Sequence, residues 1–124
     1  MTPESAVKRA ILDYLTARHI LAFRMQSGVS FAEYKGRQRA IPYGTPGMAD
    51  LLAFPEVDGR PHPLWIECKT QKGKQSELQK YFQTMVTDRG HTYIVARCIE
   101  DVEATLASAS LAALAATEKG EEGE

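Results

Sequence analysis

The order of hydrophobic and polar positions predicts a chain that mixes helices and strands. The first helix begins near the N-terminus, where Thr2 can cap it and Pro3 suits its first turn. Its apolar residues recur at helical spacing and form one stripe, made of Val7, Ile11, Tyr14 and Leu15. Glu4 precedes Val7 by one turn on this stripe, so we expect its carboxylate to face the body of the protein. Compensation of the helix dipole is the simplest role for that carboxylate.

Short apolar runs bounded by turn residues predict strands at residues 20–27, 48–54, 64–69 and 92–97. Between the first two runs, Lys35-Gly36-Arg37-Gln38-Arg39 predicts a hairpin with a basic tip. A solvated turn would explain these charges equally well. Arginine forks and the nearby Tyr34 and Tyr43 also suit phosphates and bases, which favours contact with a ligand that carries both.

Two of these runs carry charged residues where a core strand should be apolar. Asp50 lies within Gly47-Met48-Ala49-Asp50-Leu51-Leu52, and Glu67 and Lys69 lie within Trp65-Ile66-Glu67-Cys68-Lys69. A turn between the runs predicts an antiparallel pair, in which Asp50 can approach Glu67. Alternation places Glu67 and Lys69 on one face of their strand, about 6.6 Å apart. Burying such charges is costly unless they are paired or bind a metal, so we expect a site here.

A second helix is predicted after a basic loop that contains Lys72 and Lys74. Ser76 and Gln79 match a capping box at its start. Its apolar face continues through Leu78, Tyr81, Phe82 and Met85. A last, alanine-rich helix is predicted from residue 100 to about residue 114, and the acidic stretch at residues 117–124 is expected to be disordered.

Composition is that of an ordinary globular protein with a single domain, which we assign to residues 1–116. The 124 residues are 44% hydrophobic and 25% charged, and no apolar run approaches the ~20 residues of a membrane helix. No signal-peptide pattern is visible, so we expect an intracellular, cytoplasmic protein. Cys68 and Cys98 lack the spacing of a zinc site and are expected to be buried thiols in strands.

The charged cluster suits phosphodiester hydrolysis. This reaction requires neutralisation of charge on the phosphoryl group and generation of hydroxide near neutral pH, and a hard cation held by carboxylates supplies both. Asp50 and Glu67 would bind the cation, together with the backbone carbonyl of Cys68. Oxygen ligands favour Mg²⁺ or Mn²⁺ over zinc. Lys69 would orient the attacking water or stabilise the developing charge, although an ion pair with Glu67 is its simplest role.

Gly47-Met48-Ala49-Asp50 followed by Glu67-Cys68-Lys69 resembles the metal-binding core of the PD-(D/E)xK nuclease superfamily. More narrowly, residues 2–99 resemble the VRR-NUC family, through Glu4, the Gln26-Ser27-Gly28 strand end and the Ser76-x-x-Gln79 helix start. The resemblance implies a restriction-endonuclease-like α/β fold. We therefore expect a central mixed β-sheet flanked by helices, with the basic β-hairpin as an insertion. The resemblance also implies DNA cleavage that depends on Mg²⁺ or Mn²⁺. For short stand-alone members from phages and bacteria, it implies homodimers that resemble Holliday-junction resolvases.

Carried over residue by residue, the resemblance assigns Asp50 and Glu67 to the metal, Lys69 to catalysis and Gln79 to the edge of the site. It also implies a functional role for Glu4, as an acid that can reach a metal-bound water. Ala49 stands where the superfamily has proline, which is a mild departure because the carboxylate is what the metal needs. The capping box explains Gln79 without any catalysis.

We therefore expect a metal-dependent DNA endonuclease that selects branched DNA, such as Holliday junctions, by its shape. A homodimer would present two active centres to two strands in a bacterial or phage-infected cell. Backbone contacts to DNA are expected from the basic hairpin and loop, namely Lys35, Arg37, Arg39, Lys72 and Lys74. The alternatives are a non-catalytic DNA-binding module with a structural ion network, and a flap-cutting or restriction-like nuclease.

Overall fold

Four strands form the central sheet of the computed structural model, which describes residues 2–108. In spatial order they are β1 (Leu21–Arg24), β4 (Leu51–Phe54), β7 (Leu64–Cys68) and β8 (Thr92–Ala96). The β1–β4 and β4–β7 pairs are antiparallel, and the β7–β8 pair is parallel. Because parallel neighbours need a crossover, the chain passes through helix α2 (Glu77–Thr87) between β7 and β8. The predicted antiparallel pairing of the two charged runs is confirmed.

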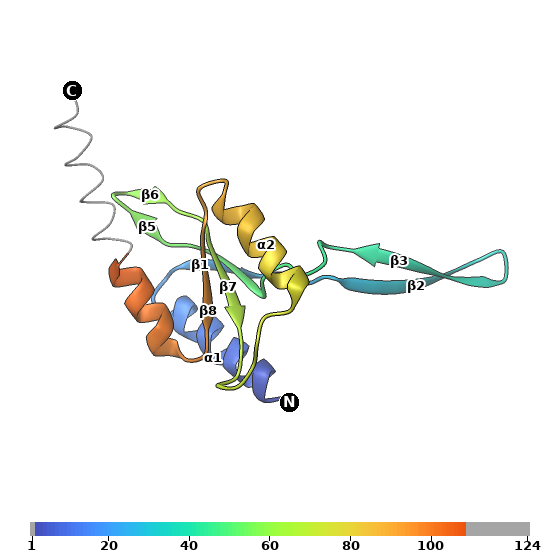
Figure 1. The fold of residues 1–124 in the computed structure, drawn as a ribbon, viewed down its shortest axis with the longest axis horizontal. Coiled ribbons are helices and arrows are strands. Elements are labelled where there is room, and N and C mark those ends of the chain that lie inside the picture. The colour runs from blue at the N-terminus through green and yellow to red at the C-terminus, as the bar shows by residue number, and fades with distance from the viewer. Residues whose placement is uncertain (1, 109–124) are drawn as a thin grey trace, which may run out of the picture.

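Helices cover both faces of the sheet, and the sheet separates the hydrophobic core into two clusters (Figure 1). Helix α1 (Pro3–Ala17) buries Ile11 and Leu15 against the side chains of one sheet face. Residues 99–108 are helical and add Val102 to the same cluster. On the other face, Phe82 of α2 packs edge-on against Trp65 with ring centroids 5.0 Å apart. The architecture is a mixed α/β fold with a mixed central sheet flanked by helices.

Side chains of β7 alternate between these two cores as the sequence predicts. Leu64, Ile66 and Cys68 belong to the cluster beneath α1, whereas Trp65 belongs to the cluster beneath α2. Alternation therefore gives Glu67 the same direction as Trp65. All five residues of β7 are buried, so the carboxylate of Glu67 lies in the most enclosed strand of the sheet.

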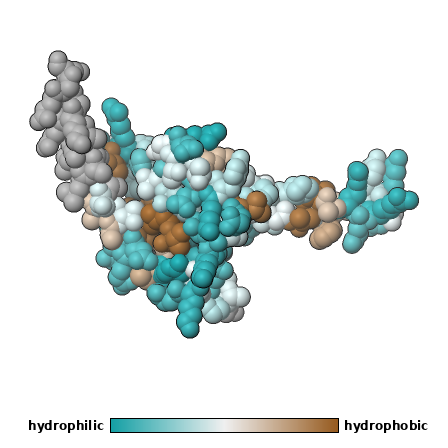
Figure 2. All heavy atoms as spheres, viewed as in Figure 1, coloured by the Kyte–Doolittle hydropathy of each residue, from teal (hydrophilic) through white to brown (hydrophobic). Residues whose placement is uncertain are grey.

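A long hairpin, hereafter the arm, consists of β2 (Gly28–Tyr34) and β3 (Arg37–Tyr43) and projects away from the sheet (Figure 1). Lys35 and Gly36 form its turn with positive φ angles of 51° and 71°, as a two-residue turn of type I′ requires. Nearly all arm residues are exposed. Figure 2 shows hydrophilic side chains at the tip and hydrophobic ones along the middle of the arm. The predicted hairpin with a basic tip is confirmed.

All four predicted strands of the sheet are shorter than the sequence suggests, β7 and β8 by one residue each and β1 and β4 by more. The runs at residues 20–27 and 48–54 form strands only over Leu21–Arg24 and Leu51–Phe54. The second run starts late because Gly47 has a φ of 78° and the N–H of Met48 donates to the carbonyl of Thr45, which makes a turn there. A second small hairpin joins β4 to β7 and contains β5 (Glu56–Val57) and β6 (Arg60–Pro61).

The predictions for the last helix and for the two cysteines are only partly confirmed. Helix is present up to residue 108, whereas the rest of the predicted helix and the acidic stretch at residues 117–124 lie outside the described residues. Cys68 is a buried strand thiol as predicted, but Cys98 follows the end of β8 and is only half-buried. Within residues 2–108, no helix is both long and apolar enough to cross a bilayer.

Gly47 fixes the approach of α2 to the β4 end of the sheet, which predicts a large effect of Gly47→Ala. A Cβ at this position would lie 2.4 Å from the carbonyl oxygen of Leu78 in α2. Gly59 has a similar φ of 73° but open space around it. We expect Gly59→Ala to lower the free energy of unfolding by about 1–2 kcal/mol through backbone strain alone. Gly47→Ala should lower it by about 1–3 kcal/mol more, because the new Cβ overlaps with the backbone of Leu78. Urea denaturation measures both, and equal losses would contradict this role of Gly47.

Candidate metal centre

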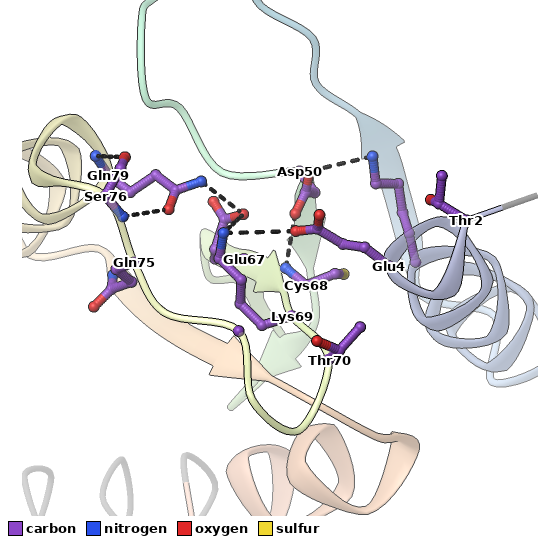
Figure 3. Close-up of polar contacts among 12 residues, drawn as sticks. Thr2, Glu4, Asp50, Glu67, Cys68, Lys69, Thr70, Gln75, Ser76 and Gln79 are labelled. Carbon is purple, nitrogen blue, oxygen red and sulfur yellow. Dashed lines mark hydrogen bonds and ion pairs between the residues drawn. The ribbon is translucent and has the colours of Figure 1, made fainter.

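Three carboxylates from separate parts of the chain meet at one end of the sheet (Figure 3). Glu4 comes from the first turn of α1, Asp50 directly precedes β4, and Glu67 lies in β7. One oxygen of each carboxylate lies within 4.8 Å of one oxygen of the other two. The predicted approach of Asp50 to Glu67 is therefore confirmed, and Glu4 joins them.

Asp50 is held in place through both of its oxygens. Its Oδ2 accepts a hydrogen bond of 2.7 Å from the backbone N–H of Cys68, and its Oδ1 lies 3.2 Å from Nζ of Lys8. The N–H of Cys68 ties Asp50 to the strand that carries Glu67, because Cys68 is the next residue in β7. This bond fixes the relative position of two of the three acids.

Glu67 is the most buried acid of the cluster, with 1% of its surface exposed. Its Oε1 accepts a hydrogen bond of 3.3 Å from Nε2 of Gln79, whereas Oε2 has no hydrogen-bond partner within residues 2–108. Burial, followed by the proximity of the Asp50 carboxylate, raises the pKa of Glu67 to about 9. The ammonium of Lys69 opposes this shift in the pKa only in part. The site thus contains a carboxyl group that lacks sufficient cationic neighbours to stabilise its charge.

Lys69 lies between two of the acids, as the spacing of Glu67 and Lys69 predicts. Its Nζ is 3.6 Å from Oε1 of Glu4 and 4.0 Å from Oε1 of Glu67, and 12% of its side chain is exposed. Its backbone N–H donates to the carbonyl of Ala96 in β8. Lys69 is therefore anchored to the sheet by its backbone while its ammonium faces the carboxylates.

Gln79 performs both of the roles that the sequence leaves open. Its Oε1 accepts from the N–H of Ser76 at 2.8 Å, which completes the capping box of α2. Its Nε2 donates to Glu67. The helix cap therefore orients an amide that reaches the buried acid, and Gln79 belongs to the site.

The donor set fits a hard divalent cation. Carboxylate oxygens are the ligands that Mg²⁺ and Mn²⁺ favour, and the cluster within residues 2–108 contains no histidine. Burial raises the pKa of Cys68 to about 12, so its thiol is neutral near neutral pH and is a poor ligand for a soft metal. The unpartnered Oε2 of Glu67 is the observation that a bound cation would explain. The role of the Cys68 carbonyl stays a prediction.

A groove of about 490 Å³ gives access to the cluster. Its walls include Asp50, Glu67 and Gln79, together with Gln26 and Ser27 after β1 and Tyr43 at the root of the arm. The segment with Gln26 and Ser27, which contributes to the resemblance, therefore borders the carboxylates. A polar groove of this size can admit an extended chain of phosphates and sugars.

The basic residues predicted to contact DNA lie away from this groove. Lys35 is in the turn of the arm, and Arg37 and Arg39 follow it in β3. Lys72 and Lys74 are exposed in the loop between β7 and α2. The predicted cations therefore lie on two separate segments, the arm and the loop before α2, and their contacts with DNA stay predictions.

Sequence reasoning missed Lys8 and Arg97. Lys8 follows Glu4 by four residues, a spacing that places both on one helix face, so its position could have been inferred once Glu4 was assigned. Arg97 donates from Nη1 to the carbonyls of Thr70, Gln71 and Gly73, and so holds the loop that carries the basic residues. No sequence motif signals this contact.

Comparisons with protein-family models, with curated proteins and with solved structures found no match to this chain.

The raised pKa of Glu67 predicts that the metal-free protein loses stability as pH rises. An unfolded glutamate releases its proton near pH 4.5, whereas folded Glu67 retains it up to about pH 9. The folded state therefore binds the extra proton between these values, and the free energy of unfolding falls as pH rises through this window. Glu67→Gln, which cannot ionise, should show a smaller fall. Urea denaturation in EDTA from about pH 5 to about pH 9 compares the two proteins, and an identical pH dependence would contradict the burial of an ionisable carboxyl.

The ion pair of Lys8 with Asp50 predicts competition between Lys8 and a divalent cation. An ammonium 3.2 Å from one ligand oxygen would repel a cation bound to the same carboxylate, and Lys8 is only 27% exposed. We expect Lys8→Met to raise the affinity for Mn²⁺ roughly tenfold, or about 1.4 kcal/mol. Isothermal titration calorimetry measures this affinity for Mn²⁺. Lys80→Met is the matched control, because Lys80 pairs with Glu77 on the exposed side of α2. A lower affinity in Lys8→Met would contradict the competition.

Proposed function

We propose that this protein is a metal-dependent DNA endonuclease. The observation that carries the proposal is the convergence of Glu4, Asp50 and Glu67 within 4.8 Å, with the ammonium of Lys69 beside two of them. Two or three carboxylates with a nearby lysine are the groups that hydrolysis of a phosphodiester requires. Mg²⁺ or Mn²⁺ is the proposed cofactor, because the donors are oxygen atoms.

Asp50 and Glu67 would hold the cation, with the Cys68 carbonyl as a further ligand and Glu4 within reach of its water. A bound divalent cation supplies charge neutralisation at the phosphoryl group and a water of lowered pKa. The hydrogen bond from the Cys68 N–H to Asp50 keeps the two ligands in register. Nε2 of Gln79 orients Glu67 by donating to its Oε1, and no donor within residues 2–108 reaches its Oε2.

Lys69 is the proposed catalytic cation. Its ammonium lies between Glu4 and Glu67, where it can donate a hydrogen bond to a phosphate oxygen or orient the attacking water. The largely buried position of its side chain strengthens this electrostatic contribution, because less water screens the charge. Removal of such a group costs about 10²–10³ in rate in comparable sites.

The restriction-endonuclease-like fold and membership of the VRR-NUC family are part of this proposal. Support for them comes from the mixed sheet in the order β1-β4-β7-β8, flanked by α1 and α2, with the acids on α1, before β4 and in β7. The arm corresponds to the predicted basic insertion. These features agree with the resemblance of the sequence to the VRR-NUC family.

Branched DNA, such as a Holliday junction, is the proposed substrate, and a homodimer is the proposed assembly. Residues 2–108 contain one such cluster, so cleavage of two strands at one junction would call for two copies of the chain. The tip of the arm and the Lys72 loop would contact backbone phosphates on either side of the groove. Such contacts would weaken binding as the salt concentration rises.

A non-catalytic DNA-binding module is the competing function, and the ion pairs of Lys8 and Lys69 favour it. In that case the acids and lysines would form a structural network with no task beyond stability. The network leaves Oε2 of buried Glu67 without a partner, which costs about 1–3 kcal/mol. A structural network would avoid this cost with a neutral residue, so the metal centre explains the cluster better.

Cleavage of a labelled four-way junction tests the proposal. We expect the wild type to cut in Mg²⁺ or Mn²⁺ and to stop when EDTA is added. Lys69→Ala should bind the junction but cut about 10²–10³ times more slowly, because the cation that faces the reacting phosphate is lost. Lys80→Ala, from an exposed ion pair, is the matched control and should cut normally.

Two outcomes of this assay would contradict the proposal in different ways. A folded wild type that binds the junction without cutting it in either metal would leave the DNA-binding module as the function. A folded Lys69→Ala protein that cuts at the wild-type rate would remove Lys69 from catalysis. Parallel reactions with a flap and a linear duplex show whether the junction is the preferred substrate.

A further inference from the structure

Tyr43 stands where the arm meets the groove of the metal centre. It is the last residue of β3, it pairs with Gly28 at the start of β2, and it lines the same groove as Asp50 and Glu67. Although it borders the groove, 46% of Tyr43 is exposed. An aromatic ring is therefore available to solvent beside the carboxylates.

Gly28 provides the space that this ring occupies. Its φ is not positive, so its backbone conformation does not require glycine. A Cβ at this position would lie 2.8 Å from Oη and 3.1 Å from Cζ of Tyr43. The outer end of the Tyr43 ring thus rests over Gly28, and any larger residue would push it away. The glycine is explained by the position of the ring and not by the turn of the chain.

One face of the arm continues outward from Tyr43 to the basic tip. Alternation along β3 places Ile41, Arg39 and Arg37 on the same face as Tyr43. Tyr34 pairs with Arg37 across the hairpin and shares that face. The six residue steps from Tyr43 to Arg37 span roughly 20 Å. Gln38 and Phe31 point to the opposite face, which provides an internal comparison.

We propose that Tyr43 is a stacking platform for an unpaired nucleobase next to the scissile phosphate, and that Arg39 and Arg37 bind phosphates of the same strand farther out. This inference rests on the proposed function and deepens it. The ring borders the carboxylates, and the arginines on its face carry charge opposite to that of DNA. Aromatic side chains bind any base by its flat face, so the platform needs no base sequence.

Stacking on Tyr43 selects DNA by its structure. In a continuous duplex each base is covered by its neighbours on both sides, whereas at a branch point or in a single strand a base can leave the stack. The groove therefore favours DNA in which the base beside the cut is unpaired. This gives a physical reason for a preference for branched over linear duplex DNA.

Fluorescence of 2-aminopurine at the branch point of a four-way junction tests the platform. Binding is measured with the full chain in Ca²⁺ in place of Mg²⁺, and we expect the wild type to quench the probe. Tyr43→Ser should lose the quenching and bind the junction roughly tenfold more weakly. Tyr43→Phe should retain both, because the ring is preserved. Gly28→Ala should resemble Tyr43→Ser, because its Cβ displaces the ring.

Matched controls separate stacking from general damage. Tyr81→Ser removes a tyrosine that is 70% exposed on α2 and should change neither quenching nor affinity. Arg39→Ala should weaken binding and reduce its salt dependence, whereas Gln38→Ala on the opposite face should not. Thermal unfolding confirms that each variant is folded.

The results distinguish this inference from the proposed function. One outcome is that the wild type binds and cuts the junction while Tyr43→Ser shows the same quenching and affinity as the Tyr81→Ser control. In that case Tyr43 is not a stacking platform, and the proposed nuclease function is unaffected. If Tyr43→Phe is as defective as Tyr43→Ser, the hydroxyl and not the flat face of the ring carries the effect, and the platform is wrong. A wild type that neither binds nor cuts any branched DNA would overturn both.

Discussion

The burial of the Glu67 carboxyl group is the constraint on which the rest of the site depends. An acid in the middle of an enclosed strand is costly unless other groups are brought to it. Three parts of the chain converge on it: Gln79 at the start of α2 donates a hydrogen bond to it, whereas Glu4 of α1 and Asp50 before β4 add negative charge that raises its pKa further. The close approach of Gly47 to Leu78 and the capping box of α2 are the local means of this convergence. These contacts therefore both hold α2 against the sheet and position the groups around Glu67.

The charges of the cluster support the proposal of a bound cation. Among residues 2–108, Lys8 pairs with Asp50 and Lys69 is shared between Glu4 and Glu67, so three acids have two cationic partners there. The charge of Glu67 is the least compensated of the three, since no donor within residues 2–108 reaches its Oε2 and its pKa is raised. A divalent cation would compensate this charge and would compete with Lys8 for Asp50. In the proposed function, a metal and a phosphate would thus replace protein cations at the site.

Local pattern was sufficient to predict much of this molecule. The alternation in β7, the arm and the capping box follow from rules that act over a few residues, and they correctly brought Asp50, Glu67, Lys69 and Gln79 together. The late start of β4 follows from the local turn at Gly47, which the apolar pattern does not show. The contacts of Arg97 join residues distant in sequence, so a pattern could not reveal them. The pattern predicts a strand at Cys98 because it and Ile99 are apolar residues that closely follow the run, but Arg97 interrupts that run and the last ladder pair is at Ala96.

Anomalous diffraction from crystals grown with Mn²⁺ tests the central claim most directly. The account predicts an anomalous peak within coordination distance of Asp50 and Glu67, with Lys8 displaced from Asp50 and Oε2 of Glu67 among the ligands. Absence of a peak at saturating Mn²⁺, with the ion pairs of Lys8 and Lys69 intact, would show that the cluster is a structural network. A peak coordinated elsewhere on the protein would contradict the account equally.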